Sequence, residues 1–296
     1  MKKLTCLAAL CMLLWFLADA GGVRAAVSQA LALCAGTVIP SLFPFLVVTT
    51  LLVSLGFGQL LSPLLEGLMV PLFRVPGCGA SALVLGLIGG YPIGAKTAAD
   101  LYRTNQLSRN EAERLLTFCN NSNPVFLISV LGSGVFGSVR TGVWLWLIHL
   151  AAALLTGLCF RGGRTPDRRQ IVSTRASFHA VSLPAAFVEA VRSSLTGILN
   201  VCAFVLFFYV LASPLWEVCP PLVGILELFS VVPLLENSSA NFVLAAGLAG
   251  WGGVSVLCQT AAVLEGSGLS IRPAALGKVL HGLFSAVLAA LLVSYM

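Results

Sequence analysis

The sequence predicts an all-α integral membrane protein, with about six transmembrane helices and two re-entrant hairpins arranged as an inverted repeat. Hydrophobic residues make up 58% of the 296 residues and charged residues only 9%, whereas an ordinary soluble domain has about 25% charged residues. With 17 basic and 11 acidic side chains, the chain cannot cover a folded surface that faces water. We therefore expect one polytopic membrane domain over residues 1–296 and no large water-soluble domain.

The cysteines and the net charge bear on other classes of protein. The nine cysteines are scattered singly, without a CxxC pair or metal-ligand spacing, so we expect no disulfide framework, metal site or cofactor. The formal net charge of +6 is interpreted as a topology signal rather than as an affinity for nucleic acid. The expected partners are the lipid bilayer and a small-molecule solute, while a coupling ion and a homo-oligomer are left open.

The first quarter of the chain predicts two spans and an interfacial segment. Residues 4–20 follow two lysines and end in an Ala-Asp-Ala string that resembles a signal-peptidase site. We expect this segment to be retained as a span, with cleavage as the alternative. Residues 26–56 are too long for one straight crossing and contain Pro40 and Pro44, so this span is expected to be kinked or tilted. Residues 59–74 are expected along the interface.

Residues 77–102 predict a first re-entrant hairpin. An apolar arm leads to the string GGYPIG at residues 89–94, and a second arm carries Lys96 and Asp100. Each arm is far shorter than the roughly 20 residues of a span, and glycine and proline suit irregular backbone at membrane depth. Lys96 has two interpretations, both open: an ion pair with Asp100 four residues later, or the counter-charge for a substrate carboxylate.

A broken transmembrane helix is expected next. Ser108 and Glu111 form a capping box that starts a helix. This helix meets the polar string CNNSNP at residues 119–124, inside an apolar run that continues to residue 136, and a further span covers residues 142–160. The polar residues of the break are predicted to cap a half-helix, to contact a ligand, or to do both.

Charge sets the expected orientation. The loop of residues 161–175 has five arginines and one aspartate, so the positive-inside rule places it in the cytoplasm. A span over residues 184–212 follows, and the next region has only Glu217, Glu227 and Glu236 as charged residues, which we expect outside. The prediction is a bacterial inner-membrane protein with both termini cytoplasmic.

The last part of the chain is expected to contain a second hairpin, over residues 241–268, with the break GWGGVS at residues 250–255. The last span begins at residue 271 and contains Lys278 and His281. The string GLIGGYPIG lies 161 residues before GLAGWGGVS, and an odd number of spans separates the two halves. We interpret this as an inverted repeat with one hairpin entering from each side. The expected units are residues 26–137, a linking helix and basic loop at 138–180, and residues 181–296.

This architecture predicts a substrate site where broken helices and hairpin tips meet near the membrane midplane. Buried backbone breaks are costly unless they line a cavity, so a transporter is expected rather than a scaffold whose hairpins only fill volume. The candidate substrate-binding residues are Tyr91, Pro92, Gly94, Lys96, Thr97, Asn120, Asn121, Ser122, Asn123, Trp251, Ser255, Gln259, Thr260 and His281, and the expected hairpin tips are Gly89, Gly90, Gly252 and Gly253.

Enzyme chemistry is not expected. The string GGYPIGAKT differs from a nucleotide-binding phosphate loop because Ala95 separates Gly94 from Lys96. The three histidines have no flanking nucleophile motif, and a histidine in a membrane helix more often bonds a neighbouring helix. Only His281 is kept as a site candidate.

Several strings resemble one known family. GYPIGAK, EAERLL, FCNNSNPVF and IPSLFPF are similar to the sporulation integral membrane protein family of the YlbJ type, which carries the nucleoside-recognition or Gate domain. The resemblance covers nearly the whole chain. It implies a multi-pass membrane protein tied to endospore formation and implicated in moving dipicolinic acid out of the mother cell. It also implies a relation to hairpin regions of concentrative nucleoside transporters.

One residue departs from the family pattern, because Asn123 stands where relatives have a glycine before the proline. We expect a transporter or permease for a small, anionic aromatic or nucleoside-like solute. A non-transporting scaffold or signalling component of spore formation is the alternative.

Overall fold

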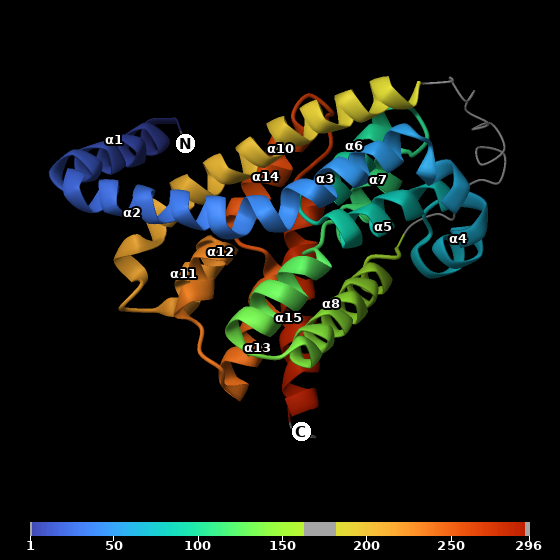
Figure 1. The fold of residues 1–296 in the computed structure, drawn as a ribbon. Coiled ribbons are helices and arrows are strands. Elements are labelled where there is room, and N and C mark those ends of the chain that lie inside the picture. Colours follow the sequence, from blue (N-terminus) through green and yellow to red (C-terminus); the bar gives the residue numbers. More distant parts are fainter. Residues whose placement is uncertain (1, 163–181, 294–296) are drawn as a thin grey trace.

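The computed structural model describes residues 2–162 and 182–293, which form helices joined by turns and short irregular segments, with no strand among them. Within these residues, five helical segments are long and apolar enough to cross a membrane, or six if one bent pair of helices counts as a span. The predicted all-helical membrane class is confirmed (Figure 1). The five segments are Ala20–Ser54, Val139–Cys159, Leu183–Leu215, Ser239–Leu264 and Arg272–Val293.

The chain begins with a short apolar helix and one very long span. Helix α1 (Lys2–Ala18) is followed by α2 (Ala20–Leu33) and α3 (Ile39–Ser54), which a π-helical turn at Cys34–Val38 joins into one segment. At 35 residues this segment is about 52 Å long, well beyond the roughly 30 Å apolar core of a bilayer. It must therefore tilt, as its length predicted.

A sharp bend follows. Helix α4 (Phe57–Phe73) is followed by a three-residue helix at Gly77–Gly79 and by α5 (Ala80–Gly89). The segments Leu60–Phe73 and Gly77–Gly89 meet at 98° across the break between them. Helix α6 (Ile93–Arg103) then folds back onto α5, as the sequence predicts for the first hairpin. The hairpin therefore lies inside the helical bundle and ends in a tip at residues 90–92.

The predicted broken helix is confirmed. Helix α7 (Arg109–Leu115) begins with a capping box in which Ser108 and Glu111 bond each other's backbone. Residues 120–123 are not helical, and the chain resumes in a π-helical segment, η3 (Phe126–Val135), before α8 (Val139–Cys159). Two glycines let η3 and α8 approach closely, since a Cβ at Gly132 would collide with the backbone of Gly142.

The second half contains a helical pair that the sequence did not predict. Helix α10 (Leu183–Ala212) packs along α2 and α3, and a short helix at Ser213–Leu215 ends this span. Helix α11 (Pro220–Leu226) and helix α12 (Leu228–Val231) then pack against each other, and a short helix at Val232–Leu234 follows. Glu227 is the residue that joins α11 to α12.

The predicted second hairpin is wrong. Helix α13 (Ser239–Trp251) and helix α14 (Val254–Leu264) continue in one 26-residue span, and the two helices lie at different levels of the bundle (Figure 1). Only Gly252 and Gly253, with φ of 83° and 95°, interrupt the helix. Left-handed backbone at two residues unwinds the helix here without reversing the chain, and the sequence alone does not distinguish the two outcomes.

The predicted inverted arrangement is not confirmed. The ends of α6 and α14, which correspond at the predicted offset, would lie on opposite sides in that arrangement. Instead, the Arg103 guanidinium donates to the carbonyl oxygens of Val263 and Glu265, at 3.2 and 3.1 Å. Likewise, the Ser270 backbone N–H donates to the Glu113 carboxylate at 3.0 Å. The proposed domain boundaries stay a prediction.

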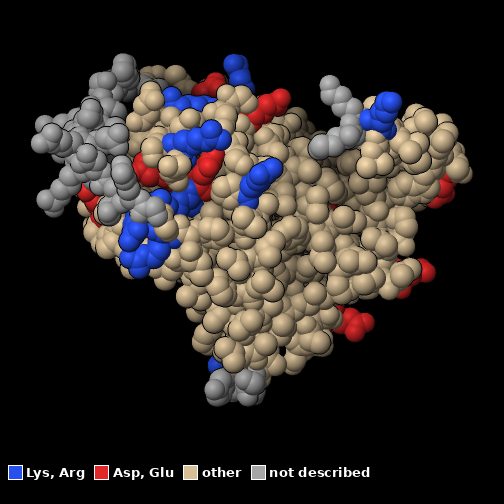
Figure 2. All heavy atoms as spheres, turned by 180° about the vertical axis from the view of Figure 1, so that it is seen from behind, with Lys and Arg blue, Asp and Glu red and all other residues tan. Residues whose placement is uncertain are grey.

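One end of the molecule gathers basic side chains. Arg103 holds the end of α14, while Arg114 donates to the Arg74 carbonyl and Arg161 to the Pro71 carbonyl. Figure 2 shows Lys and Arg gathered toward one end of the rear face. Helix α15 (Arg272–Val293) starts near α7 and ends away from the basic end (Figure 1), so termini on one common side are not confirmed. Most of the predicted arginine loop lies outside the described residues.

Candidate functional site

The site lies where the hairpin tip and the two helix breaks meet. At Gly94, a Cβ would collide with the Cys119 carbonyl, so α6 can lie directly on the first break only because residue 94 is glycine. A Cβ at Gly252, in the second break, would lie 3.0 Å from the Tyr91 hydroxyl of the hairpin tip. A Cβ at Gly253 would lie 3.1 Å from the Leu226 carbonyl at the end of α11. Four irregular segments are thus in contact.

Tyr91 and Lys278 connect these segments. Lys278, on α15, is only 2% exposed, and its Nζ donates to the Tyr91 Oη at 2.7 Å and to the Asn120 carbonyl at 3.0 Å. The Tyr91 hydroxyl donates in turn to the Ala249 carbonyl at 2.9 Å, and Lys278 Nζ lies 4.5 Å from the Tyr91 ring centroid. Among the described residues, no carboxylate forms an ion pair with Lys278. A basic group therefore stands in the membrane interior with only neutral partners.

The asparagines of the first break form different hydrogen bonds. Asn120 Nδ2 donates to Thr260 Oγ1 on α14 at 2.9 Å, and Asn121 Nδ2 donates to the Phe118 carbonyl at 2.9 Å. Asn123 Oδ1 accepts the Phe126 backbone N–H at 2.7 Å, which caps the next helical segment. The capping role predicted for this string is therefore present at Asn123, whereas Asn120 connects the first break to α14.

Two buried histidines, His149 and His281, pack beside the first break. The Ser122 backbone N–H donates to His149 Nε2 at 3.1 Å, so this nitrogen carries no proton. His281 Nε2 bonds the His149 carbonyl at 3.0 Å and must be the donor there, since a carbonyl only accepts. The ring centroids are 4.3 Å apart. His281, a predicted site residue, thus acts here with His149, which the sequence interpretation set aside.

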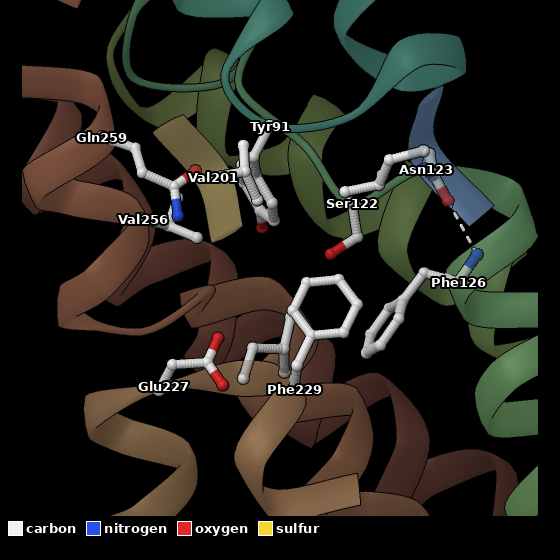
Figure 3. A pocket seen from close by; sticks show the side chains of 11 residues that line it. Tyr91, Ser122, Asn123, Phe126, Val201, Glu227, Phe229, Val256 and Gln259 are labelled. Atoms are coloured by element: carbon white, nitrogen blue, oxygen red, sulfur yellow. Dashed lines mark hydrogen bonds between the residues drawn. The ribbon is translucent and has the colours of Figure 1, made fainter. Parts of the chain in front are cut away.

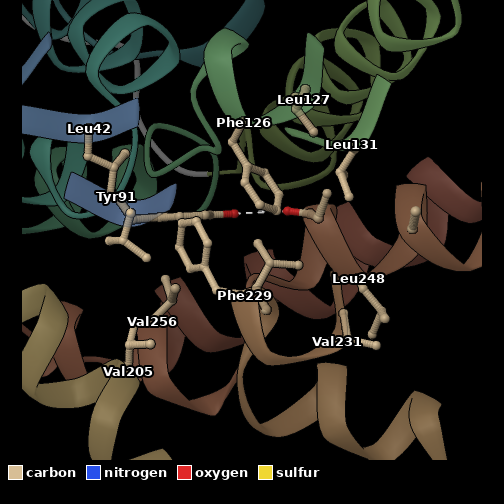
Figure 4. Close-up of a cluster of buried hydrophobic side chains, with 14 of the residues drawn as sticks. Leu42, Tyr91, Phe126, Leu127, Leu131, Val205, Phe229, Val231, Leu248 and Val256 are labelled. Atoms are coloured by element: carbon tan, nitrogen blue, oxygen red, sulfur yellow. Dashed lines mark hydrogen bonds between the residues drawn. The ribbon is translucent and has the colours of Figure 1, made fainter. Parts of the chain in front are cut away.

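A small pocket of about 20 Å³ lies beside this network (Figure 3). Apolar side chains form much of its wall, and they belong to the large buried cluster of Figure 4. Two lining residues each carry a buried polar atom without a hydrogen-bond partner within the described residues: Asn123 Nδ2, a donor, and Gln259 Oε1, an acceptor. The lining residues are Leu42, Tyr91, Ser122, Asn123, Phe126, Val201, Glu227, Leu228, Phe229, Val256 and Gln259.

Other predicted site residues lie around the pocket without lining it. Thr97 is buried on α6, Pro92 precedes α6, and Gly89 ends α5 beside Gly90 of the tip. Ser255 Oγ accepts from Gln259 Nε2 at 3.3 Å and so orients the pocket amide. Trp251 Nε1 donates to the Ile225 carbonyl at 2.9 Å, which fastens α13 to α11.

Lys96 lies apart from the pocket. Its side chain is 52% exposed, and its Nζ lies 3.2 Å from the Asp100 carboxylate, which also pairs with Arg103 at 3.1 Å. Of the two interpretations in the sequence, the structure forms the ion pair. The expectation that Lys96 is deeply buried is therefore not met.

Three residues of the site were missed as candidates. Lys278 and His149 were noted in apolar spans, and an ionisable residue within a span is itself a functional signal. Glu227 was interpreted as an outside acid, yet it is 1% exposed and lines the pocket. Its flanking sequence, with apolar residues on both sides and no basic neighbour, was the available signal.

Similarity to known proteins extends over both halves of the chain. Residues 35–163 match the Gate family model, described as nucleoside recognition. The chain is 30% identical over 300 aligned residues to the sporulation integral membrane protein YlbJ of Bacillus subtilis (strain 168), and the match covers 86% of this chain and 74% of that protein. The chain belongs to the YlbJ family. No solved structure matches it.

Only part of the pocket lining of this YlbJ-family protein lies within the residues that match the Gate family model. It contains Tyr91, Ser122 and Asn123, which form one wall. Glu227 and Gln259 of the opposite wall, and Lys278 behind Tyr91, lie beyond the matched residues. In this YlbJ-family protein, the pocket is therefore completed by the second half of the chain.

Proposed function

We propose that this protein is a transporter for a small aromatic or nucleoside-like solute, and that the solute ring binds between the two helix breaks when this pocket widens. The observation that carries this proposal is the pair of unpartnered polar atoms on two lining residues, Asn123 Nδ2 and Gln259 Oε1. A buried polar group without a partner costs about 1–3 kcal/mol. A solute that offers one acceptor and one donor at its ring edge removes both costs.

The walls favour a flat ring. Tyr91, Phe126 and Phe229 line the pocket, and the rings of Phe126 and Phe229 are in edge-to-face contact with centroids 4.9 Å apart. Aromatic walls with a few convergent polar groups are typical of small-molecule sites. The nucleoside-recognition description of the matched family model is consistent with such a ring.

Charge decides between neutral and anionic solutes. Lys278 contacts the pocket through Tyr91 and stabilises negative charge there, as an aromatic acid such as dipicolinic acid requires. Glu227 opposes an anion while it is ionised, so an anionic solute requires this carboxyl group to be neutral. We propose both solute types for testing, because the two charged residues act in opposite directions.

The orientation in the membrane follows from the basic end. Under the positive-inside rule, the end that carries Arg74, Arg103, Arg114 and Arg161 faces the cytoplasm of a bacterial cell. Helix α15 then ends on the outer side.

Uptake by vesicles that contain only the purified protein tests the function. Radiolabelled dipicolinate, nucleosides and related aromatic acids are offered in turn, and we expect at least one to enter faster than into empty vesicles. Asn123→Ala and Gln259→Ala should each reduce uptake roughly tenfold, the equivalent of about 1.4 kcal/mol. Asn241→Ala serves as the control, because Asn241 is a partly buried asparagine at the start of α13 that bonds the Glu236 carbonyl outside the pocket. Absence of uptake across the whole panel would favour the non-transporting scaffold.

A further inference from the structure

Glu227 is the one acidic side chain on the pocket lining. It joins α11 to α12 outside the five long spans, and its carboxylate points into the space toward Gln259 and Tyr91 (Figure 3). One oxygen, Oε2, accepts both bonds from Ser230, from the backbone N–H at 2.5 Å and from Oγ at 2.7 Å. Glu227 is only 1% exposed, yet it lines the pocket.

No cation neutralises this group within the described residues. Glu189 and Arg192, the charged residues of α10, are exposed near its start. The other titratable groups on the elements around Glu227 are Tyr91 at the hairpin tip, Cys34 in the π-helical turn, Cys202 and Tyr209 on α10, and Cys258 on α14. These groups are uncharged near neutral pH at their ordinary pKa values. Lys278 bonds Tyr91 and Asn120 instead of Glu227. An ionised Glu227 thus faces the pocket with only neutral groups of residues 228–230 as its hydrogen-bond partners.

We propose that Glu227 is the binding site for a coupling proton, and that the solute and the proton cross the membrane together. This inference rests on the transport function proposed above. A carboxylate oxygen takes a proton from water on one side and forms an O–H bond. After the solute leaves, that bond breaks and the proton passes to water on the other side. No other bond changes.

Burial explains why protonation and solute binding favour each other. Burial raises the pKa of the Glu227 carboxyl group above its ordinary value, although the bonds from Ser230 act in the opposite direction. A solute ring that enters the pocket excludes water from Glu227 and makes its ionised form still less favourable. The neutral acid, in contrast, offers an O–H donor to the solute. As pH falls, a larger fraction of Glu227 carries a proton, and the affinity for the solute rises with that fraction.

Glu111 provides a matched control within the same chain. Its Oε2 accepts the Ser108 N–H at 2.8 Å and the Ser108 Oγ at 2.7 Å, the same pair of bonds that Glu227 makes with Ser230. It is also buried, but it lies at the basic end near Arg114 and outside the pocket. A general loss of helix capping affects both residues alike, whereas loss of proton coupling affects only Glu227.

The test uses the full chain in sealed vesicles with an imposed pH gradient and a trapped pH dye. Wild-type protein should accumulate solute above equilibrium when the solute side is acidic, and the dye should report proton entry that depends on solute. Glu227→Gln should reduce both the accumulated solute and the rate of solute-dependent proton entry at least tenfold. Solute exchange without a gradient should continue at a reduced rate. Glu111→Gln should keep all three.

The possible failures are distinguishable. If the wild type transports no solute, the proposed function fails. If the wild type transports solute without moving protons, only the proton proposal fails, and this result does not depend on any variant. Proton-coupled accumulation by Glu227→Gln would also overturn it. If Glu227→Gln does not fold, Glu227→Asp replaces it: this variant keeps an acid, and we expect accumulation to persist with a shifted pH profile.

Discussion

Replacement of Tyr91 by phenylalanine removes a single hydroxyl group from the centre of the buried network. That hydroxyl accepts from Lys278 Nζ at 2.7 Å and donates to the Ala249 carbonyl at 2.9 Å. A hydrogen bond to a charged group contributes about 1.5–3 kcal/mol and a neutral one about 1 kcal/mol. Interhelical hydrogen bonds in membranes are weaker, about 0.6 kcal/mol on average and about 1.7 kcal/mol at most. We therefore expect Tyr91→Phe, which removes two such bonds, to lower the free energy of unfolding by about 1–3 kcal/mol.

The assay is reversible unfolding of the purified protein in mixed detergent and SDS micelles. Tyr209→Phe is the control, because the hydroxyl group of this other buried tyrosine has only a long contact of 3.5 Å with Gln29. We expect the control to change the free energy of unfolding by less than about 0.5 kcal/mol. If Tyr91→Phe unfolds within that margin of the wild type, the hydroxyl does not join α15 to the hairpin tip.

Two further predictions concern the contact between the segments and the path of the chain. Gly94→Ala should sharply reduce the yield of folded, monodisperse protein, because its Cβ would collide with the Cys119 carbonyl, whereas Gly197→Ala, with open space around it, should fold normally; equal yields would refute the close contact. Single cysteines at Glu236 and Glu265, in a cysteine-free chain, should react with an impermeant thiol reagent from opposite faces, because α13 and α14 form one span between them. Reaction of both from the same face would restore the second hairpin.

Local signals were sufficient for part of the fold. Ser108 and Glu111 form the predicted capping box because this motif satisfies orphan N–H groups within four residues. The polar string before Pro124 breaks its helix for a similarly local reason, and Asn123 caps the helical segment after the break. The first hairpin was predictable since each of its arms is too short to cross.

The remainder depends on tertiary contacts that a sequence pattern does not encode. Gly252 and Gly253 indicate an interruption, but whether the chain continues or reverses depends on how α14 packs with α6 and α10. Glu227 and Gln259 meet Asn123 only after segments more than 100 residues apart have packed together. Lys278 contacts Tyr91 across 187 residues. Composition therefore predicts the membrane class, while the pocket emerges only from the folded bundle.

A structure of the protein with a transported solute bound is the most direct test of the central claim. We expect the solute ring beside Phe126 and Phe229, with hydrogen bonds to Asn123 Nδ2 and Gln259 Oε1, the two polar atoms without partners in the pocket. A solute bound instead at the exposed pair of Lys96 and Asp100, with the pocket still closed, would contradict the account.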